Sequence, residues 1–250
     1  MRKFFVADEN IIDGVAHILG EDVKHIYKVL RLKSGDSVII NNCCGEEFSG
    51  VISNVNKSEV QVKIIEKLHL NSESNIEIHL FQGFPKSTKM DLIVQKATEL
   101  GVREITPIFT ERVIVKNKNC ESKKIQRWNK IALEACKQCK RSIIPKINLP
   151  MDFDEVVEAV KSKDIIVVPY ENEKNFGVKK LIKSIDRNNV KSIAVIIGPE
   201  GGFADSEINA LKNINSNIVT LGSRILRTET AGFVCVSLLM YELGDLGGID

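Results

Sequence analysis

Ile193-Ala-Val-Ile-Ile197 runs directly into Gly198-Pro-Glu-Gly-Gly-Phe203, and Ile218-Val-Thr-Leu221 runs into Gly222-Ser-Arg-Ile-Leu-Arg-Thr-Glu-Thr-Ala231. Each apolar run predicts a buried strand, and each glycine-rich stretch predicts the loop after it. In open α/β sheets, ligands bind outside the carboxyl ends of strands, and glycine lets the backbone approach a ligand closely. The two loops therefore predict a ligand site built mainly from backbone. Three charged residues border this site: Glu200, Arg227 and Glu229.

The same alternation of strands and helices extends back to residue 76. Strands are predicted at Ile76–Gln82, Glu104–Phe109 and Ile165–Val168. Helices are predicted at Thr88–Leu100, Ser122–Lys140, Asp154–Ser162, Val178–Ile185, Ser206–Leu211 and Thr228–Leu243. Such alternation indicates an α/β domain with a mostly parallel sheet covered on both faces.

The first 70 residues follow a different pattern. Strands are predicted at Ser37–Ile40, Glu47–Ser53 and Glu59–Glu66, with one helix at Glu21–Leu30. Short strands with few helices indicate a small β-barrel. The polar, aperiodic stretch His69–Asn75 predicts a linker. We therefore expect two domains, residues 1–71 and residues 72–250.

Positive charge is concentrated in one segment of a chain whose formal net charge is only +2. Arg112–Pro150 contains eleven Lys or Arg and two Glu, a local charge of +9. Within it, the predicted helix has one apolar stripe: Ile125, Trp128, Ala132, Ala135 and Cys139. Bases fall on the opposite side: Lys123, Arg127, Lys130, Lys137 and Arg141. This ribbon favours contact with a nucleic-acid backbone, and the alternative is a solvated, lysine-rich helix face.

Sequence motifs typical of several other nucleotide-binding and hydrolytic enzymes are absent from the sequence. There is no GxxxxGK[ST], no GxGxxG after the first strand of the α/β region and no Gly-x-Ser-x-Gly. The four histidines are dispersed, and the Cys136-x-x-Cys139 pair has no second ligand pair at zinc spacing, so no metal is expected. No apolar run reaches the ~18 residues that span a bilayer. The composition predicts a globular, cytoplasmic protein with reduced cysteines.

The glycine loops together with other motifs resemble one family across nearly the whole chain. These motifs are Arg2-Lys3-Phe4-Phe5, His25-Ile-Tyr-Lys-Val-Leu-Arg31, Gln82-Gly83-x-Pro85-Lys86, Glu99-Leu-Gly-Val102, Glu134–Arg141 and Asp245-Leu-Gly247. They are similar to the RsmE family, one of the knotted SPOUT methyltransferase families. Members of the RsmE family methylate nitrogen 3 of a uridine in 16S ribosomal RNA. Met151–Asn189 matches weakly.

The resemblance implies S-adenosylmethionine as cofactor, a trefoil knot, an amino-terminal PUA-like RNA-binding barrel and a homodimer. It also implies 16S ribosomal RNA or the small ribosomal subunit as partner. The cofactor-binding residues expected on this basis are Pro169, Ile197, Gly198, Pro199, Glu200, Gly201, Gly202, Leu221, Gly222, Ile225, Leu226, Thr230 and Ala231. The RNA-binding residues expected are Arg2, Lys24, Lys28, Arg31, Arg112, Lys123, Arg127, Lys130, Lys137 and Arg141.

The catalytic candidates follow from the chemistry of the uracil ring. Its nitrogen carries a proton that must leave, so a base or an oxyanion-stabilising cation is wanted. Arg227 is a candidate for stabilising charge on the uracil oxygens, and Glu229 or Glu200 for accepting the proton. Alternatively, Arg227 and Glu229 form an ion pair that locks the loop. Two other functions stay open: methylation of a ribose 2′-hydroxyl or a guanine, and a non-catalytic RNA-binding assembly factor.

Overall fold

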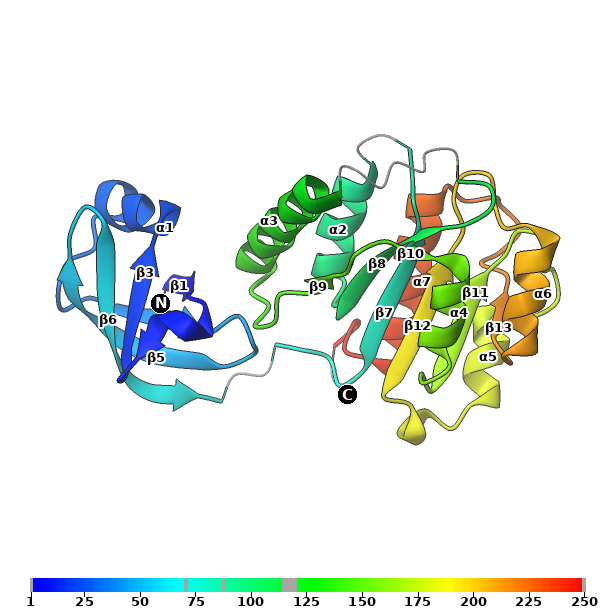
Figure 1. Ribbon diagram of the computed structural model, residues 1–250. Helices are drawn as coiled ribbons and strands as arrows, with labels where there is room; N and C mark the ends of the chain where they lie inside the picture. The colour runs from blue at the N-terminus through cyan, green and yellow to red at the C-terminus, as the bar shows by residue number, and fades with distance from the viewer. Residues whose placement is uncertain (1, 70–71, 87–88, 114–120, 249–250) are drawn as a thin grey trace. The chain divides into compact units, whose positions relative to one another are not determined.

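The computed structural model describes residues 2–69, 72–86, 89–113 and 121–248, and the chain forms two compact units. Unit 1 consists of residues 1–73 and 136–144, and unit 2 of residues 74–135 and 145–250. Figure 1 shows a strand-rich unit 1 and a unit 2 in which helices cover a central sheet. The predicted fold class, an α/β domain preceded by a small β domain, is confirmed.

Unit 1 is built on a six-stranded sheet in the order β1-β4-β5-β6-β3-β2, in which only the β1–β4 pair is parallel. Its strands are β1 (Arg2–Phe5), β2 (Ile11–Ile12), β3 (Val15–Leu19), β4 (Ser37–Asn41), β5 (Glu47–Val55) and β6 (Glu59–Leu68). Alternate residues of the strands face one core, such as Val38 and Ile40 of β4 and Val60 and Val62 of β6. The sequence predicted β4, β5 and β6 and missed β1, β2 and β3.

The helix predicted at residues 21–30 exists, but it changes its winding part-way. It starts as α1 (Glu21–Lys24) and continues as η2 (His25–Leu30), a stretch of π-helix that ends where Arg31 adopts a left-handed φ of 53°. Val23 and Ile26 pack into the core of unit 1. Lys24, Lys28 and Arg31, three of the expected RNA-binding residues, are exposed.

Unit 2 contains a parallel sheet in the order β10-β8-β7-β12-β11-β13, with β9 paired to β8. Its strands are β7 (Glu77–Gly83), β8 (Glu104–Phe109), β9 (Lys146–Ile147), β10 (Met151–Asp152), β11 (Ile165–Pro169), β12 (Ser192–Ile197) and β13 (Asn217–Val219). The central strands are buried along almost their whole length, as a sheet covered on both faces requires.

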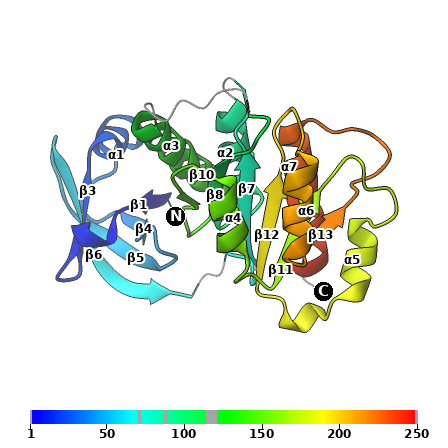
Figure 2. The ribbon, with the colours of Figure 1, turned by 45° about the vertical axis from the view of Figure 1, so that its right-hand side comes forward.

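Helices cover both faces of this sheet, as Figures 1 and 2 show. The helices of unit 2 and the connecting turn are α2 (Lys89–Glu99), α3 (Glu121–Cys139), α4 (Phe153–Val160), α5 (Val178–Ser184), η4 (Arg187–Asn189), α6 (Asp205–Asn213) and α7 (Thr228–Leu243). On one face α7 contacts both α2 and α5, and on the other α4 contacts α6. The predicted helices agree with these bounds within a few residues; Thr88, the predicted start of α2, lies outside the described residues.

The parallel register brings the carboxyl ends of four strands to one edge of the sheet. Gln82 of β7 pairs with Ile197 of β12, and Pro169 of β11 pairs with Val219 of β13. The glycine-rich loops leave the sheet at this edge, because they follow β12 and β13 directly. The edge is therefore where a ligand site is expected.

Candidate functional site at the carboxyl edge of the parallel sheet

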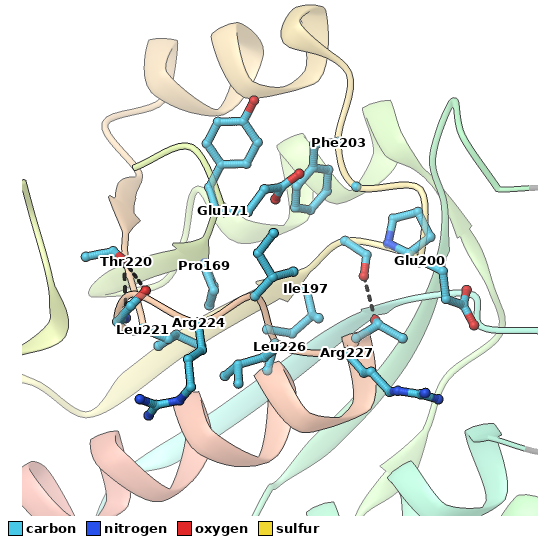
Figure 3. Close-up of a pocket in the computed structure, with 18 of the residues that line it drawn as sticks. Pro169, Glu171, Ile197, Glu200, Phe203, Thr220, Leu221, Arg224, Leu226 and Arg227 are labelled. Carbon is cyan, nitrogen blue, oxygen red and sulfur yellow. Dashed lines mark hydrogen bonds between the residues drawn. The ribbon is translucent and has the colours of Figure 1, made fainter. Parts of the chain in front are cut away.

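A pocket of about 510 Å³ opens at this edge (Figure 3). Its lining comes from residues 169–171 at the end of β11, 197–200 and 202–203 at the end of β12, and 220–227 after β13, together with Thr228 and Ala231 of α7 and Lys89 at the start of α2. In Figure 3, Glu171 and Phe203 lie across the pocket from Leu226, and Glu200 and Arg227 lie toward one end. The walls are thus formed by loops held on a rigid sheet.

Glycines are required where these loops pass close to other backbone. A Cβ on Gly83, at the end of β7, would lie 2.4 Å from the backbone nitrogen of Pro199. Gly202 has a left-handed φ of 68°, and a Cβ there would lie 2.7 Å from Oε1 of Glu171. Gly83 therefore has to be glycine because of the close approach to backbone, and glycine is favoured at Gly202 because of its left-handed φ.

The hydroxyl of Thr228 ties three segments of the pocket together. It donates to the carbonyl of Gly198 at 2.6 Å and accepts from Nε2 of Gln82 at 2.8 Å. Both Thr228 and Gln82 are buried. The start of α7, the loop after β12 and the end of β7 therefore hold a common position.

Lys89 joins two of the candidate carboxylates. Its Nζ lies 3.2 Å from Oε1 of Glu200 and 3.3 Å from Oε2 of Glu229. Burial alone would raise the pKa of Glu200, but its own backbone amide, the backbone amide of Lys86 and the Lys89 ammonium outweigh burial and lower its pKa. The hydrogen bond to Glu200 is the largest cause that raises the pKa of Lys89. Glu200 and Lys89 therefore both carry their charge at neutral pH.

The sequence missed Lys89 because its partners are 111 and 140 positions away along the chain. A usable signal existed, since Lys89 begins the helix after β7 and therefore lies at the same sheet edge as the loops. Arg224, Phe203, Tyr170, Glu171 and Thr220 also line the pocket without having been predicted.

The structure gathers most of the predicted cofactor residues in this one pocket. Those that line it are Pro169, Ile197, Gly198, Pro199, Glu200, Gly202, Leu221, Gly222, Ile225, Leu226 and Ala231. Gly201 and Thr230 are not among the lining residues, so their prediction as cofactor contacts is not supported by the geometry. Gly201 instead approaches Arg112, whose Cβ would lie 3.1 Å from a Cβ at Gly201.

The catalytic candidates occupy different places. Glu200 and Arg227 line the pocket, whereas Glu229 is 13% exposed and pairs with Lys89. The alternative of an Arg227–Glu229 ion pair is therefore wrong for the described part of the chain. Arg227 is exposed at the cap position before α7.

The basic ribbon predicted on α3 is shorter than expected. Lys123 and Lys130 are exposed, and Arg127 is exposed while pairing with Asp91. Lys137, whose side chain is 26% exposed, pairs with Asp22. The exposed part of the ribbon therefore consists of Lys123, Arg127 and Lys130, in the amino-terminal half of the helix.

The prediction that Arg141 lies on this exposed face is wrong. Arg141 is only 5% exposed and donates to both carboxylate oxygens of Glu73. The helix ends at Cys139, and Lys140 takes a left-handed φ of 64°, so Arg141 leaves the helical face on which it was placed. Arg2 and Arg112, the remaining RNA candidates, are exposed.

Among the described residues, no group of three or more His, Cys, Asp or Glu side chains could hold a metal ion. None of the described helices is both long and apolar enough to cross a membrane. Burial raises the pKa of the Cys136 and Cys235 thiols to about 12. Cys120 lies outside the described residues.

Comparison with known proteins identifies the family. The family described as RNA methyltransferase domain matches residues 72–240, and the RNA methyltransferase PUA domain matches residues 18–65. A Buchnera aphidicola protein named ribosomal RNA small subunit methyltransferase E is 34% identical over 97% of this chain and 94% of its own. This chain belongs to the ribosomal RNA small subunit methyltransferase E family.

Further similar proteins agree with this chain in sequence and in structure. The Bacillus subtilis protein of that name is 33% identical over 92% of this chain and 91% of its own. A Neisseria gonorrhoeae methyltransferase E bound to S-adenosyl methionine is 25% identical, with a TM-score of 0.84 over 98% of this chain and 99% of that one. A methyltransferase from Legionella pneumophila with bound SAM is 34% identical, with a TM-score of 0.81 over 98% of both chains.

Proposed function

We propose that this protein transfers a methyl group from S-adenosylmethionine to nitrogen 3 of a uridine in 16S ribosomal RNA. The observation that carries the proposal is the pocket of about 510 Å³ in which both glycine-rich loops meet at the carboxyl edge of the sheet. The family supports the same reading, since its members are named for methylating the RNA of the small ribosomal subunit.

The residues of the pocket fit the cofactor. Ile197, Leu226 and Phe203 offer apolar walls of the kind that hold an adenine ring, and the carboxylate of Glu171 suits hydroxyl or cationic groups. A Cβ on Gly202 would fill the space beside Glu171, so the glycine keeps that space open for a ligand. The pocket-lining residues named above are the ones that would hold S-adenosylmethionine.

S-adenosylmethionine supplies a methyl group on a positively charged sulfur, which is already an activated electrophile. The protein has to align the acceptor nitrogen with that bond and to manage the proton on the nitrogen. Arg227 faces the pocket and stabilises the charge that develops on a uracil oxygen. Glu200 also faces the pocket and accepts a hydrogen bond from the N3–H group. Glu229 orients Lys89, which in turn orients Glu200.

The two domains have different roles in the proposed function. Residues 1–71 form the RNA-binding domain, in which Arg2, Lys24, Lys28 and Arg31 contact phosphates. Residues 72–250 form the knotted methyltransferase domain, in which Lys123, Arg127, Lys130 and Arg112 add to the RNA contact. The exposure of these side chains supports the assignment. The protein acts in the cytoplasm, where ribosomal RNA is made and assembled.

The protein acts as a homodimer. α7 is apolar around most of its circumference, and one face remains open in the single chain: Leu238 is 37% exposed and Tyr241 is 65% exposed. A second copy that covers this face removes apolar surface from water. Light scattering is expected to give twice the chain mass of 27.9 kDa, and a monomer at micromolar concentration would contradict the dimer.

The test of the function uses small subunits, and RNA extracted from them, from a strain that lacks this protein. The purified protein is incubated with either substrate and S-adenosylmethionine, and the RNA is digested for nucleoside mass spectrometry. N3-methyluridine is the expected product. A ribose-methylated nucleoside or a methylguanosine would instead show a different acceptor. No methylation together with tight RNA binding would show a binding factor.

A further inference from the structure

A second, smaller pocket lies beside the one described above. Its volume is about 160 Å³, and it is lined by Phe84, Pro85, Lys86, Arg112, Val113, Pro199, Glu200 and Gly201. These residues follow β7, β8 and β12 at the same carboxyl edge. With about a third of the volume of the first pocket, it suits a group much smaller than a nucleoside cofactor.

The two pockets share one wall. Pro199 and Glu200 are the residues common to both linings. A methyl transfer requires the acceptor atom to lie directly beside the methyl group, on the side away from its sulfur. A group held in the second pocket meets this requirement if its acceptor atom faces the Pro199–Glu200 wall.

The apolar side of the second pocket is held rigidly. Phe84 stacks on Phe109 at a centroid distance of 5.4 Å and lies 6.0 Å from the Trp128 ring. The ammonium of Lys124 lies 5.0 Å from the Phe84 centroid, so a base in the pocket meets the edge of Phe84 or replaces Lys124 over its face. Val113 is 8% exposed. The guanidinium of Arg112 donates to the Gly201 carbonyl at 3.2 Å, which joins the loop after β8 to the loop after β12.

On its polar side, the second pocket presents the Glu200 carboxylate, a hydrogen-bond acceptor, among the cationic side chains of Lys86, Lys89 and Arg112. Oε1 of Glu200 accepts from the backbone nitrogen of Lys86 at 3.1 Å and from Lys89. Its other oxygen, Oε2, takes part in neither contact. The side chains of Lys86 and Arg112 are exposed at the rim, where they add positive charge that suits RNA.

We propose that the second pocket receives the target base, turned out of the RNA, with its ring against Phe84 and Val113 and its N3–H group directed at Glu200. This proposal rests on the function proposed above. An uracil edge presents a carbonyl, an N–H and a second carbonyl, and so it matches an acceptor flanked by donors. Cytosine carries no hydrogen at that nitrogen and leaves the Glu200 carboxylate without a donor. Enzymes that modify bases use such apolar pockets for the extruded base.

The experiment compares variants that change the second pocket with control variants that make the same kind of change elsewhere on the surface. Val113→Phe adds bulk inside the pocket, and Leu149→Phe adds a ring at a position that is 65% exposed between β9 and β10. A second pair removes one charge: Arg112→Gln at the pocket and Arg187→Gln at an exposed ion pair with Glu242. Cofactor affinity is measured by calorimetry, RNA affinity by filter binding and methyl transfer under single-turnover conditions at saturating RNA.

Val113→Phe is expected to slow methyl transfer by about tenfold or more, equivalent to about 1.4 kcal/mol, while its affinity for S-adenosylmethionine stays within about twofold. Arg112→Gln is expected to slow transfer in the same way, and both control variants are expected to match the wild type. RNA in which the methylated nucleotide has been made abasic is expected to bind Val113→Phe and the wild type equally.

Three results would overturn the proposal. Unchanged transfer in both Val113→Phe and Arg112→Gln would show that the pocket is not used. A lost cofactor affinity in a folded Val113→Phe protein would assign the pocket to the cofactor. Preferential loss of abasic RNA binding in Val113→Phe would assign it to the RNA backbone. If the wild type methylates no RNA at all, the proposed function fails first, and that result is distinguishable from each of these three.

Discussion

Replacing Thr228 by Val tests whether one hydroxyl holds the cofactor pocket together. The two side chains have nearly the same shape, so the change removes the hydroxyl with little change in packing. It breaks the bonds to Gly198 at 2.6 Å and to Gln82 at 2.8 Å. The Gln82 amide keeps a longer bond to the Gly83 carbonyl at 3.3 Å, whereas the Gly198 carbonyl loses its donor.

The magnitude follows from these two bonds. Each contributes about 0.5–1.5 kcal/mol net, and the part-buried Gly198 carbonyl left without its donor adds to the cost, so we expect a loss of about 2–3 kcal/mol. For a unit of this size, that corresponds to a fall in Tm of roughly 4–12 °C. The single tryptophan, Trp128, is buried in unit 2 with Thr228, so its fluorescence follows the unfolding of that unit.

The same change is expected to weaken S-adenosylmethionine binding by about tenfold, because the freed loops must be ordered on binding. Calorimetry measures this affinity. Thr228→Ser is the matched control, since serine keeps the hydroxyl and loses only a methyl group. If the valine variant were as stable and bound the cofactor as tightly as the serine variant, the hydroxyl would not hold the loops, and the pocket would be fixed by the sheet alone.

Two further predictions concern other parts of the molecule. Gly202→Ala should weaken cofactor binding measured by calorimetry, because its Cβ would strike Glu171, while Gly14→Ala has the same left-handed φ strain and nothing within 4 Å, so it should leave that affinity unchanged. Gln at both Lys123 and Lys130 should weaken RNA binding and reduce its log–log salt slope by about 0.7–0.9 for each lost phosphate contact. An unaltered slope would mean that the ribbon of α3 is only a solvated face.

Much of unit 2 follows from the sequence because its patterns are local. The bounds predicted for α7 and β8 agree with the structure residue for residue, since Thr228–Leu243 and Glu104–Phe109 are rich in apolar residues and are flanked by polar or glycine-containing stretches. The two-residue strands β9 and β10 carry no such pattern. They exist because they pair with β8, which is a long-range property of the sheet.

In the site, too, local sequence patterns were predictable and features that depend on long-range contacts were not. Its place after β12 and β13 is predictable, because parallel strands end at a common edge. Which of two adjacent glycines faces the pocket is not predictable: Gly202 lines it and Gly201 turns to Arg112. The exposure of a base at a helix end depends on where the helix stops, and one left-handed residue, Lys140, placed Arg141 in the interior.

The ion cluster at the pocket decides which group titrates during methyl transfer. The pKa of Glu200 is lowered, so the stability that its ionisation contributes is present above its ordinary pKa and is lost as pH falls through the lower folded value. The pKa of Lys89 is raised, so its contribution is present below its ordinary pKa and is lost as pH rises through the higher folded value. Across the neutral range neither group changes charge.

A carboxylate with a lowered pKa is a poor acceptor for the proton of the uracil N–H, which is a far weaker acid than a carboxylic acid. Glu200 therefore acts as a hydrogen-bond acceptor that positions the base before transfer. The proton leaves the uracil toward solvent, which frees the in-plane lone pair of N3, and that lone pair must then turn from Glu200 to the methyl carbon. The rate of methyl transfer should then rise with pH in the alkaline range, as more of the uracil is deprotonated. Glu200→Gln should lower the rate at every pH and leave the position of this rise unchanged. A rise that moves or vanishes in that variant would identify Glu200 as the titrating base and contradict the role given to it here.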